Sequence, residues 1–292
     1  MTQPNGGSVA PHGASQLRPP IPYFGGKITL AEQIASLLPP HKHYVEPFAG
    51  GLSVLLAKTP SQVETVNDLD QDLVTFWRVL RDTPEDLIRV ASATPHSRAE
   101  YLAAYDLDGA GSDLERARRV WVILSQGRAG TLRRTGWRHQ QTARGRSSAV
   151  TTDLISLTDR MGPAADRLRR VTLECRDALD VIRDYGRDPD ALIYADPPYL
   201  SGTRAGAVYR HEMADKAAHR ALAETLHACS AAVVLSGYHS PLYDVLYGGW
   251  HVHEIAAWTG QGSVRGERTE VLWSNRPLVT DGDLTLFAEA TA

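Results

Sequence analysis

The chain has very little cysteine and lysine, and it has no long hydrophobic run. Its two cysteines, Cys175 and Cys229, are too few for a disulfide scaffold and form no CxxC pair, so we interpret them as small core residues of a protein from a reducing compartment. No run of 18 apolar residues occurs, which excludes a membrane-spanning helix. The first residues lack the basic and apolar segments of a signal peptide, so we expect a cytoplasmic protein.

The composition that remains is that of an ordinary globular protein. Hydrophobic residues make up 42% and charged residues 22% of the 292 positions, and the mean hydropathy is -0.28. These values argue against disordered, collagen-like and membrane classes. The length suits one large α/β domain that carries a sizeable insertion.

The positive charge is concentrated in one segment. Only four of the 31 basic residues are lysines, and nine arginines lie between Glu115 and Arg146, where Glu115 is the sole acid. That segment carries a charge of +8, so the rest of the chain carries -11 of the total of -3. Such a patch is typical of a phosphate-backbone contact, and the interleaved Trp121 and Trp137 could stack on bases. A solvated helix face in a chain that uses arginine everywhere is the alternative.

Hydrophobic periodicity predicts alternating strands and helices at both ends of the chain. Strands are predicted at residues 43–46, 63–66, 171–174, 191–195, 232–235, 251–256 and 269–273, and helices at 29–38, 52–57, 70–80 and 216–228. Between residues 83 and 170 the alternation stops, and helices are predicted at 83–90, 98–105, 114–124 and 152–168. The fold class is therefore an α/β sheet, built from residues 18–82 and 171–276, with an inserted, mostly helical domain at 83–170 and flexible tails at 1–17 and 277–292.

Candidate binding residues follow the first two of these strands. Ligands of open α/β sheets bind at the carboxyl ends of the strands. Glu46 is followed by Pro47, Phe48 and a pair of glycines, which allow close approach of the backbone, while the carboxylate suits a cationic group and would repel a pyrophosphate. A dinucleotide fingerprint, GxGxxG, is missing there. Asp68, after the second strand, can accept both hydroxyls of a ribose or can cap the next helix.

The strand at residues 191–195 runs into Asp196, Pro197, Pro198 and Tyr199. The two prolines fix the backbone, so the Asp196 carboxylate, the Pro197 carbonyl and the Tyr199 ring are held at the strand end. Two acceptors beside a ring suit a planar amine with two hydrogens on a heterocycle. A proline-rich strand terminator is the plainer alternative.

Taken together, the motifs resemble the D12 class of DNA adenine methyltransferases, the Dam-like family with its motifs in the α order. The resemblance extends over about residues 20–275 and rests on Pro22-Tyr23-Phe24-Gly25-Gly26-Lys27, Glu46-Pro47-Phe48-Ala49-Gly50-Gly51, Asn67-Asp68, Asp196-Pro197-Pro198-Tyr199, Leu235-Ser236-Gly237-Tyr238 and Arg268-Thr269-Glu270-Val271-Leu272-Trp273. It implies a Rossmann-like class I methyltransferase sheet, with the insert as the target-recognition domain of a phage-type, site-specific enzyme. Pro22 stands where relatives that act on GATC often have lysine, so that target is not carried over.

The resemblance also implies the ligands. The cofactor would be S-adenosylmethionine, with S-adenosylhomocysteine as product and no metal, and the partner would be double-stranded DNA, with a cognate restriction nuclease as an open question. The implied cofactor residues are Tyr23, Gly25, Lys27, Glu46, Pro47, Phe48, Gly50, Asp68 and Asp177. Lys27 would meet the methionine carboxylate and Asp68 the ribose. Asp177 would receive the amino group of the cofactor adenine or would only cap a helix.

The chemistry that follows is a direct displacement on a flipped adenine. The adenine amine is a poor nucleophile inside the base stack, so the base must leave it, and Asp196, Pro197, Pro198 and Tyr199 would then hold it. Cytosine C5 methylation is rejected because neither cysteine follows a proline. Methylation of the cytosine exocyclic amine and an inactive Dam-like DNA-binding protein stay as alternatives. Metal binding by the pair His251 and His253 is less favoured than an exposed strand.

Five residues of the basic segment are the candidates for DNA contact: Arg128, Arg133, Arg134, Trp137 and Arg138. We expect the arginines to divide between phosphates and guanine edges. Trp137 is either a wedge that enters the space left by the flipped base or a core residue of the insert.

Overall fold

A computed structural model describes residues 17–139, 150–200, 210, 213, 215–258 and 267–279. The tails expected at residues 1–17 and 277–292 lie almost wholly outside the described residues, and so do Arg144 and Arg146 of the basic segment. None of the helices within the described ranges is long and apolar enough to cross a membrane.

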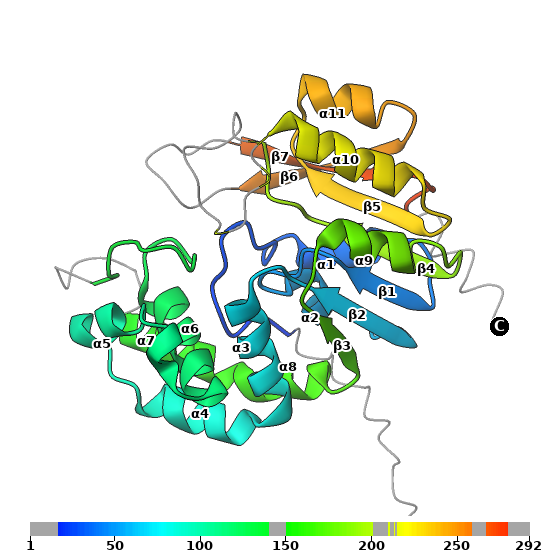
Figure 1. Cartoon of the computed structure of the whole chain (residues 1–292). Coiled ribbons are helices and arrows are strands. Elements are labelled where there is room, and N and C mark those ends of the chain that lie inside the picture. The colour runs from blue at the N-terminus through cyan, green and yellow to red at the C-terminus, as the bar shows by residue number, and fades with distance from the viewer. Residues whose placement is uncertain are drawn as a thin grey trace, which may run out of the picture.

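A mixed sheet forms the centre of the molecule (Figure 1). Within the described residues it has seven strands in the order β3-β2-β1-β4-β5-β7-β6. The strands are β1 (His43–Glu46), β2 (Val63–Asn67), β3 (Val171–Glu174), β4 (Ala191–Ala195), β5 (Ala232–Gly237), β6 (His251–Trp258) and β7 (Glu267–Ser274). The first five strands in this order pair in parallel, and β7 runs antiparallel between β5 and β6. The predicted sheet is confirmed.

The central strands are buried along their whole length, which explains their continuous apolar sequences. Every residue of β4 and β5 is buried, and the two strands pair from Leu192 with Ala232 to Ala195 with Leu235. A parallel strand covered by helices on both faces has no polar face, so it reads as an unbroken apolar run. The buried apolar run ends with β4, so Asp196 is the first residue after the strand.

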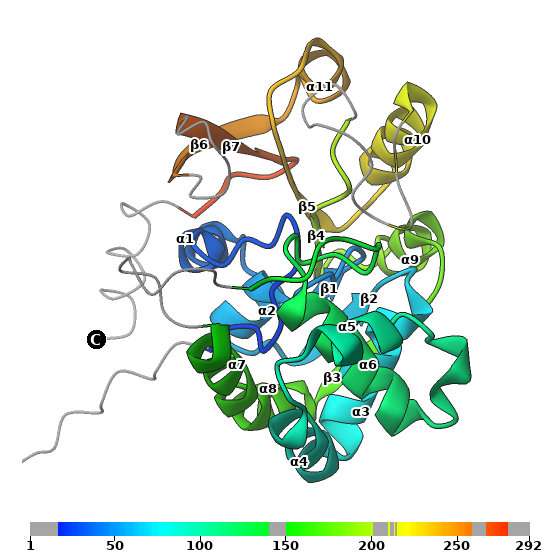
Figure 2. The ribbon, with the colours of Figure 1, turned by 90° about the vertical axis from the view of Figure 1, so that its left-hand side faces the viewer.

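Helices cover both faces of the sheet (Figure 2). One face carries α1 (Ala31–Leu37), with α2 (Ser53–Ala57) packed on it, and the other carries α9 (Ala178–Tyr185) and α10 (Lys216–His227). The short helix α11 (Pro241–Leu246), which the sequence pattern did not predict, lies near α10. Ser240 caps it and Pro241 occupies its first turn, which are ordinary start signals, but six residues are too few to show a helical period.

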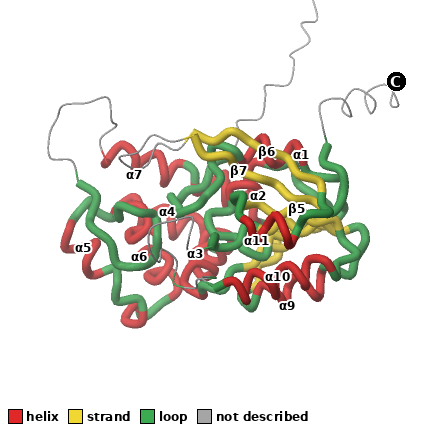
Figure 3. The backbone as a smooth tube through the Cα atoms, turned by 90° about the horizontal axis from the view of Figure 1, so that it is seen from above, coloured by secondary structure: helices red, strands yellow, loops and turns green. Residues whose placement is uncertain are grey.

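Between β2 and β3, the regular elements of the described residues are all helices. After α3 (Gln71–Asp82) come α4 (Pro84–Ala93), α5 (Arg98–Ala103), the 3-10 turn η1 (Asp108–Ala110), α6 (Asp113–Gln126), α7 (Val150–Asp159) and α8 (Met161–Leu168). We call α4 to α8 the helical module. Figure 3 shows its helices gathered on one side of the molecule, away from the strands.

The helical module shares its core with the sheet. Helix α3 packs along α6, and buried Trp77 of the one and Trp121 of the other belong to a single cluster of buried residues that also includes Leu192 and Val234 of the sheet. The predicted insert at 83–170 lies between the end of α3 at Asp82 and the start of β3 at Val171, and its division from the sheet as a separate domain stays a prediction.

One predicted helix is divided in two. The pattern at residues 152–168 suggested one continuous helix, whereas α7 ends at Asp159 and α8 begins at Met161. Pro163 explains the break, because a proline lacks the N–H that would continue the ladder and its ring clashes with the carbonyl four residues earlier, that of Asp159. In the first turn of α8 neither problem arises.

Candidate active site

A cavity of about 290 Å³ opens at the carboxyl ends of β1, β2 and β4. It brings together the predicted cofactor residues Tyr23, Gly25, Lys27, Glu46, Pro47, Phe48, Gly50, Asp68 and Asp177 with the predicted catalytic residues Asp196 and Pro198. Pro197 and Tyr199 lie outside the lining. Segments far apart in the sequence therefore meet here because their strands are neighbours in the sheet.

The turn after β1 is shaped by glycine. Gly50 has a positive φ of 48°, and a Cβ there would lie 3.0 Å from Cδ1 of Tyr23, so the ring can pack directly on the backbone. The indole Nε1 of Trp77 donates to the carbonyl oxygen of Gly50 at 3.1 Å. The turn is thus held from α3 on one side and by Tyr23 on the other.

Asp68 fixes the same turn from β2. Its Oδ2 accepts from the backbone N–H of Gly50 at 2.9 Å, and its Oδ1 accepts from that of Asp70 at 2.9 Å. The cap of α3 is Asp70, whose side chain accepts from the N–H groups of Asp72 and Leu73. The capping alternative for Asp68 is therefore wrong, and its half-buried carboxylate faces the cavity.

Asp177 does cap a helix. Its Oδ1 accepts from the N–H of Leu179 at 2.8 Å at the start of α9, and the residue also lines the cavity. The two interpretations of Asp177 are compatible, since a carboxylate has a second oxygen.

Glu46 is the most deeply buried acid of the cavity. Its side chain is 3% exposed, and Oε2 accepts from the hydroxyl of Tyr44 at 2.9 Å. The pKa of Glu46 is raised to about 8, chiefly by burial; the Tyr44 hydrogen bond opposes the change, and the nearby Asp196 carboxylate adds to it. A cation in the cavity would favour the ionised form, which agrees with the cationic group expected from the sequence.

The ammonium group of Lys27 binds the Asp196 carboxylate. The lysine Nζ donates to Oδ1 at 2.9 Å and to Oδ2 at 2.8 Å, and it also donates to the carbonyl oxygen of Gly25 and to the hydroxyl of Tyr199. Lys27 is only 6% exposed. The structure therefore places this ammonium on the predicted catalytic carboxylate, a contact that the sequence pattern does not predict.

Three further residues complete this cluster, and sequence reasoning gave none of them a role. Oε1 of Glu270 accepts from the Tyr199 hydroxyl at 2.7 Å and from the Ser236 hydroxyl at 2.6 Å. The ring of Tyr238 meets that of Tyr199 edge to face, with 4.8 Å between centroids. The available signal was Glu270 itself, the one acid in the strand predicted at residues 269–273.

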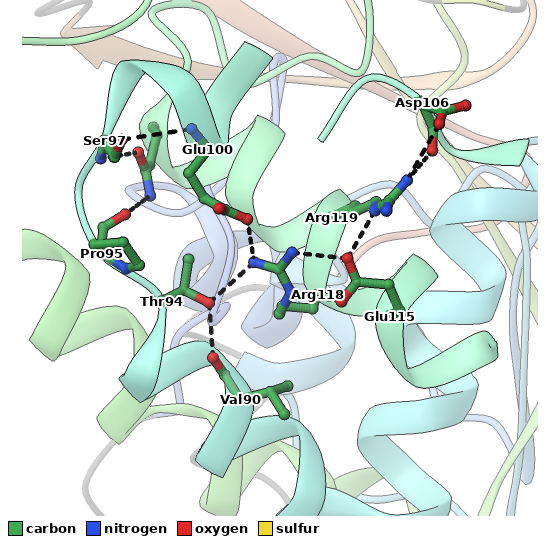
Figure 4. Close-up of polar contacts among 10 residues, drawn as sticks. Val90, Thr94, Pro95, Ser97, Glu100, Asp106, Glu115, Arg118 and Arg119 are labelled. Carbon is green, nitrogen blue, oxygen red and sulfur yellow. Dashed lines mark hydrogen bonds and ion pairs between the residues drawn. The ribbon is translucent and has the colours of Figure 1, made fainter. Parts of the chain in front are cut away.

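The arginines of α6 serve the helical module (Figure 4). Arg118 donates to Glu115 at 2.7 Å and to Glu100 at 2.6 Å, and Arg119 donates to Glu115 at 2.7 Å. Arg116 pairs with Asp72 of α3. These three arginines are neutralised within the protein, so the patch of +8 inferred from the sequence is wrong as a count of DNA-facing charge.

All five predicted DNA-contact residues lie on the loop that follows α6. Arg128, Arg133 and Arg134 are exposed, whereas Arg138 is half-buried, with its Nη1 3.4 Å from Oδ2 of Asp153. The N–H of Arg128 donates to the carbonyl of Gly136 at 3.1 Å, which narrows the loop to a hairpin-like shape. We call residues 127–139 the recognition loop.

Trp137 is packed within this loop. Its ring stacks on those of His96 and His139, with centroid separations of 4.5 Å and 5.3 Å, and its Nε1 lies 3.3 Å from Oε1 of Gln126. The guanidinium of Arg98 lies 4.8 Å from the ring centroid. These contacts favour the packing interpretation over the wedge.

The recognition loop is tied to the cavity. The N–H of Phe24 donates to the carbonyl of Gly130 at 2.7 Å. Gly130 has a φ of 58°, and a Cβ there would lie 3.2 Å from the carbonyl oxygen of Pro22. The helical module thus contacts the segment that carries Tyr23 and Lys27.

A strand order of this kind, with an antiparallel β7 and a cavity at the ends of β1, β2 and β4, defines a Rossmann-like methyltransferase. The chain belongs to the D12 class of N6 adenine-specific DNA methyltransferases, whose family model matches residues 23–260. It is similar to the type II methyltransferase M1.LlaDCHI of Lactococcus lactis subsp. cremoris, with 31% identity over 281 residues, 89% of this chain and 95% of that one.

Two further relatives are more distant or shorter matches. The type II methyltransferase M.MjaIII of Methanocaldococcus jannaschii is 24% identical over 271 residues, covering 83% of this chain and 92% of the relative. The DNA N-6-adenine-methyltransferase of Escherichia phage P1 is 36% identical over 69 residues, 24% of this chain and 9% of the relative. The expected adenine-specific DNA methyltransferase is confirmed, and the cytosine alternative has no support.

Proposed function

We propose that the Asp196 carboxylate and the Pro197 carbonyl accept the two amine hydrogens of an adenine flipped out of double-stranded DNA. The observation that carries this proposal is the position of Asp196. It follows the buried strand β4 and faces the same cavity as Glu46, at the end of the neighbouring strand β1, and Asp68, which follows β2, the next strand beyond β1. A base amine at Asp196 would therefore stand beside a cofactor held at the ends of β1 and β2.

The two acceptors would direct the amine. In a free base the nitrogen lone pair is delocalised into the ring, and hydrogen bonds from both amine hydrogens would turn the nitrogen towards tetrahedral geometry. Tyr199 would stack on the base, and the edge of Tyr238 against Tyr199 would limit the movement of that ring. Positioning of two reactants in this way is worth up to about 7 to 11 kcal/mol, which suits direct displacement without a covalent intermediate.

The cavity suits S-adenosylmethionine. This cofactor supplies a methyl group on a positively charged sulfur. Glu46 would face that charge, Asp68 would accept the ribose hydroxyls, and Phe48 would offer an apolar wall. The backbone of Gly50, with the Tyr23 ring packed against it, leaves room for close approach of the ligand.

Lys27 would have to leave Asp196 before the amine could bind, because its ammonium donates to both carboxylate oxygens. The cofactor site offers the destination that the family resemblance implies, the methionine carboxylate. Binding of cofactor would in this way prepare Asp196 for the base.

The recognition loop would contact the DNA. Its exposed arginines Arg128, Arg133 and Arg134 stand on the loop that touches Phe24 of the cavity segment, so phosphate or base contacts made there would lie near the flipped adenine. A cognate restriction nuclease and a cytoplasmic, prokaryotic or phage setting stay predictions.

The test is transfer of a labelled methyl group to DNA that lacks N6-methyladenine, followed by identification of the methylated base. N6-methyladenine at a fixed sequence supports the proposal, and single-molecule sequencing of the product would give that sequence. Binding in a gel-shift assay without transfer would instead support the inactive DNA-binding alternative. Methylation of another base would overturn the adenine mechanism.

A further inference from the structure

Glu270 is buried where a charge is costly. It lies in the middle of β7, opposite Ile255 of β6, and its residue is 2% exposed. A carboxylate removed from water is tolerated only with hydrogen-bond and charge partners. Those partners are the hydroxyls of Tyr199 and Ser236 and, at 3.6 Å, the ammonium of Lys27. Every one of them belongs to the cluster around Asp196.

The hydroxyl of Tyr199 has two acceptors and one proton. It lies 2.7 Å from Oε1 of Glu270 and 2.9 Å from Oδ1 of Asp196, and its oxygen is already an acceptor for Nζ of Lys27. Burial and the two carboxylates raise the pKa of Tyr199 well above the usual range, so the proton stays on the tyrosine. The hydroxyl can therefore donate a hydrogen bond to only one of the two carboxylates at a time.

The choice matters for the reaction. If Tyr199 donates to Asp196, one oxygen of the catalytic carboxylate is a weaker acceptor for the amine. If it donates to Glu270, both oxygens of Asp196 keep their accepting strength. Hydrogen bonds to charged acceptors are the strong ones, so a competing donor at Asp196 would be felt directly.

We propose that Glu270 is a positioning residue that accepts the hydrogen bond of the Tyr199 hydroxyl and thereby keeps Asp196 available to the adenine amine. It acts through Tyr199 and does not touch the base. Ser236 holds the carboxylate from β5, so the acceptor stays aligned with the hydroxyl. The hydrogen bond from Tyr199 to Glu270 also anchors the Tyr199 ring, on which the base would stack. The inference rests on the proposed role of Asp196.

The first test is Glu270→Gln, measured by single-turnover methyl transfer to DNA that lacks N6-methyladenine. The amide has nearly the same shape but accepts more weakly than the remaining Asp196 carboxylate, so the Tyr199 hydroxyl would donate its hydrogen bond to Asp196 instead. We expect the transfer rate to fall about 10- to 100-fold, in line with the loss of one hydrogen bond to a charged group. Cofactor and DNA affinities should change by less than about threefold, because the residue contacts neither.

The second test is the double variant Glu270→Gln with Tyr199→Phe. Phenylalanine has no hydroxyl proton to send to Asp196, so the double variant should be as fast as Tyr199→Phe alone and at least as fast as Glu270→Gln alone. A merely structural Glu270 would give losses that multiply and a lower melting temperature.

The outcomes separate two failures. Normal transfer by Glu270→Gln, or multiplied losses in the double variant, would overturn the role of Glu270 while the activity of the unchanged protein still supports the proposed function. An unchanged protein that transfers no methyl group to any DNA would overturn the proposed function and this inference with it.

Discussion

Charge is arranged differently in the helical module and in the cavity. In the module Arg118 lies between Glu115 and Glu100, and each acid has its base within 2.7 Å. Glu46, Asp196 and Lys27 line the cavity, Glu270 lies outside the lining at 3.6 Å from the ammonium of Lys27, and the pKa values of Glu46 and Glu270 are both raised. The module uses its charges to hold helices together, whereas the cavity keeps an excess of acid that a cationic ligand would relieve.

Replacement of the catalytic carboxylate should have the largest effect. Asp196→Ala removes an acceptor of the amine, and we expect methyl transfer to fall about 10²- to 10⁴-fold, with DNA binding and melting temperature nearly unchanged. Asp190→Ala is the control, because that acid pairs with Lys42 on the surface, where it is 57% exposed. Near-normal turnover by Asp196→Ala would contradict the mechanism.

The next largest difference should be between the effects of replacing Asp68, the proposed ribose acceptor, and Asp70, which caps α3. Asp68→Ala removes the proposed ribose acceptor, so cofactor affinity measured by calorimetry should fall about 10- to 100-fold. Its neighbour Asp70 caps α3, and Asp70→Ala should chiefly lower stability, by about 1 kcal/mol for the lost cap. Unchanged affinity in Asp68→Ala would leave this residue with only its role in holding the turn at Gly50.

Two arginines of the basic segment should behave as opposites. Arg118→Ala leaves Glu100 without its base and Glu115 with Arg119 alone, and we expect the free energy of unfolding to fall by about 1 to 3 kcal/mol in urea denaturation. The exposed Arg133, changed to Ala, should leave stability intact, weaken binding to all DNA sequences and reduce the salt slope by about one. A loss of DNA affinity without a loss of stability in Arg118→Ala would contradict this division.

The pH dependence of stability should also differ between the two regions. The pKa of Glu46 in the folded protein, about 8, is above the ordinary 4.5. Its contribution to the free energy of unfolding is therefore full below pH 4.5 and is lost as pH rises through about 8. The hydrogen bond from Arg118 lowers the pKa of Glu115 to about 2, so its contribution is present above pH 4.5 and is lost as pH falls through about 2.

Glu46→Gln should therefore flatten the stability profile on the alkaline side, and Glu115→Gln on the acid side. The measurement is urea unfolding from pH 3 to pH 9 for each variant and the unchanged protein. A flattening on the same side in both would show that the two regions do not differ in this way.

Most of the fold could be predicted from sequence, since its strands are long enough to show their type. The ranges of β1, β3 and β4 were predicted to the residue, and α11 was missed because it is short. The break between α7 and α8 was missed because their apolar pattern continues across Arg160. Periodicity reports which residues face the core, and it does not report where the backbone turns.

The sequence predicted which residues line the site better than it predicted the contacts between them. Strand ends that meet at one edge of a sheet follow from topology, so the lining of the cavity was largely foreseen. The Lys27 contact with Asp196 joins residues 169 positions apart in the chain. Likewise, no spacing rule says that Arg118 faces two acids, because its Glu100 partner lies on another helix. Such pairs are decided by packing, which a linear pattern does not contain.

The hydrogen bond between Phe24 and Gly130 has a consequence for engineering. A segment grafted between α6 and α7 to test the proposed role of this loop in DNA contact would be joined at its two chain ends and, through this bond, at a third point beside Tyr23. The graft must supply a carbonyl in that place, on a residue that tolerates a φ of 58°. A grafted loop that lacks such a residue would bind DNA but would not hold the segment with Tyr23 and Lys27 in place. Exchange of such loops would therefore change DNA specificity and the rate of methyl transfer separately.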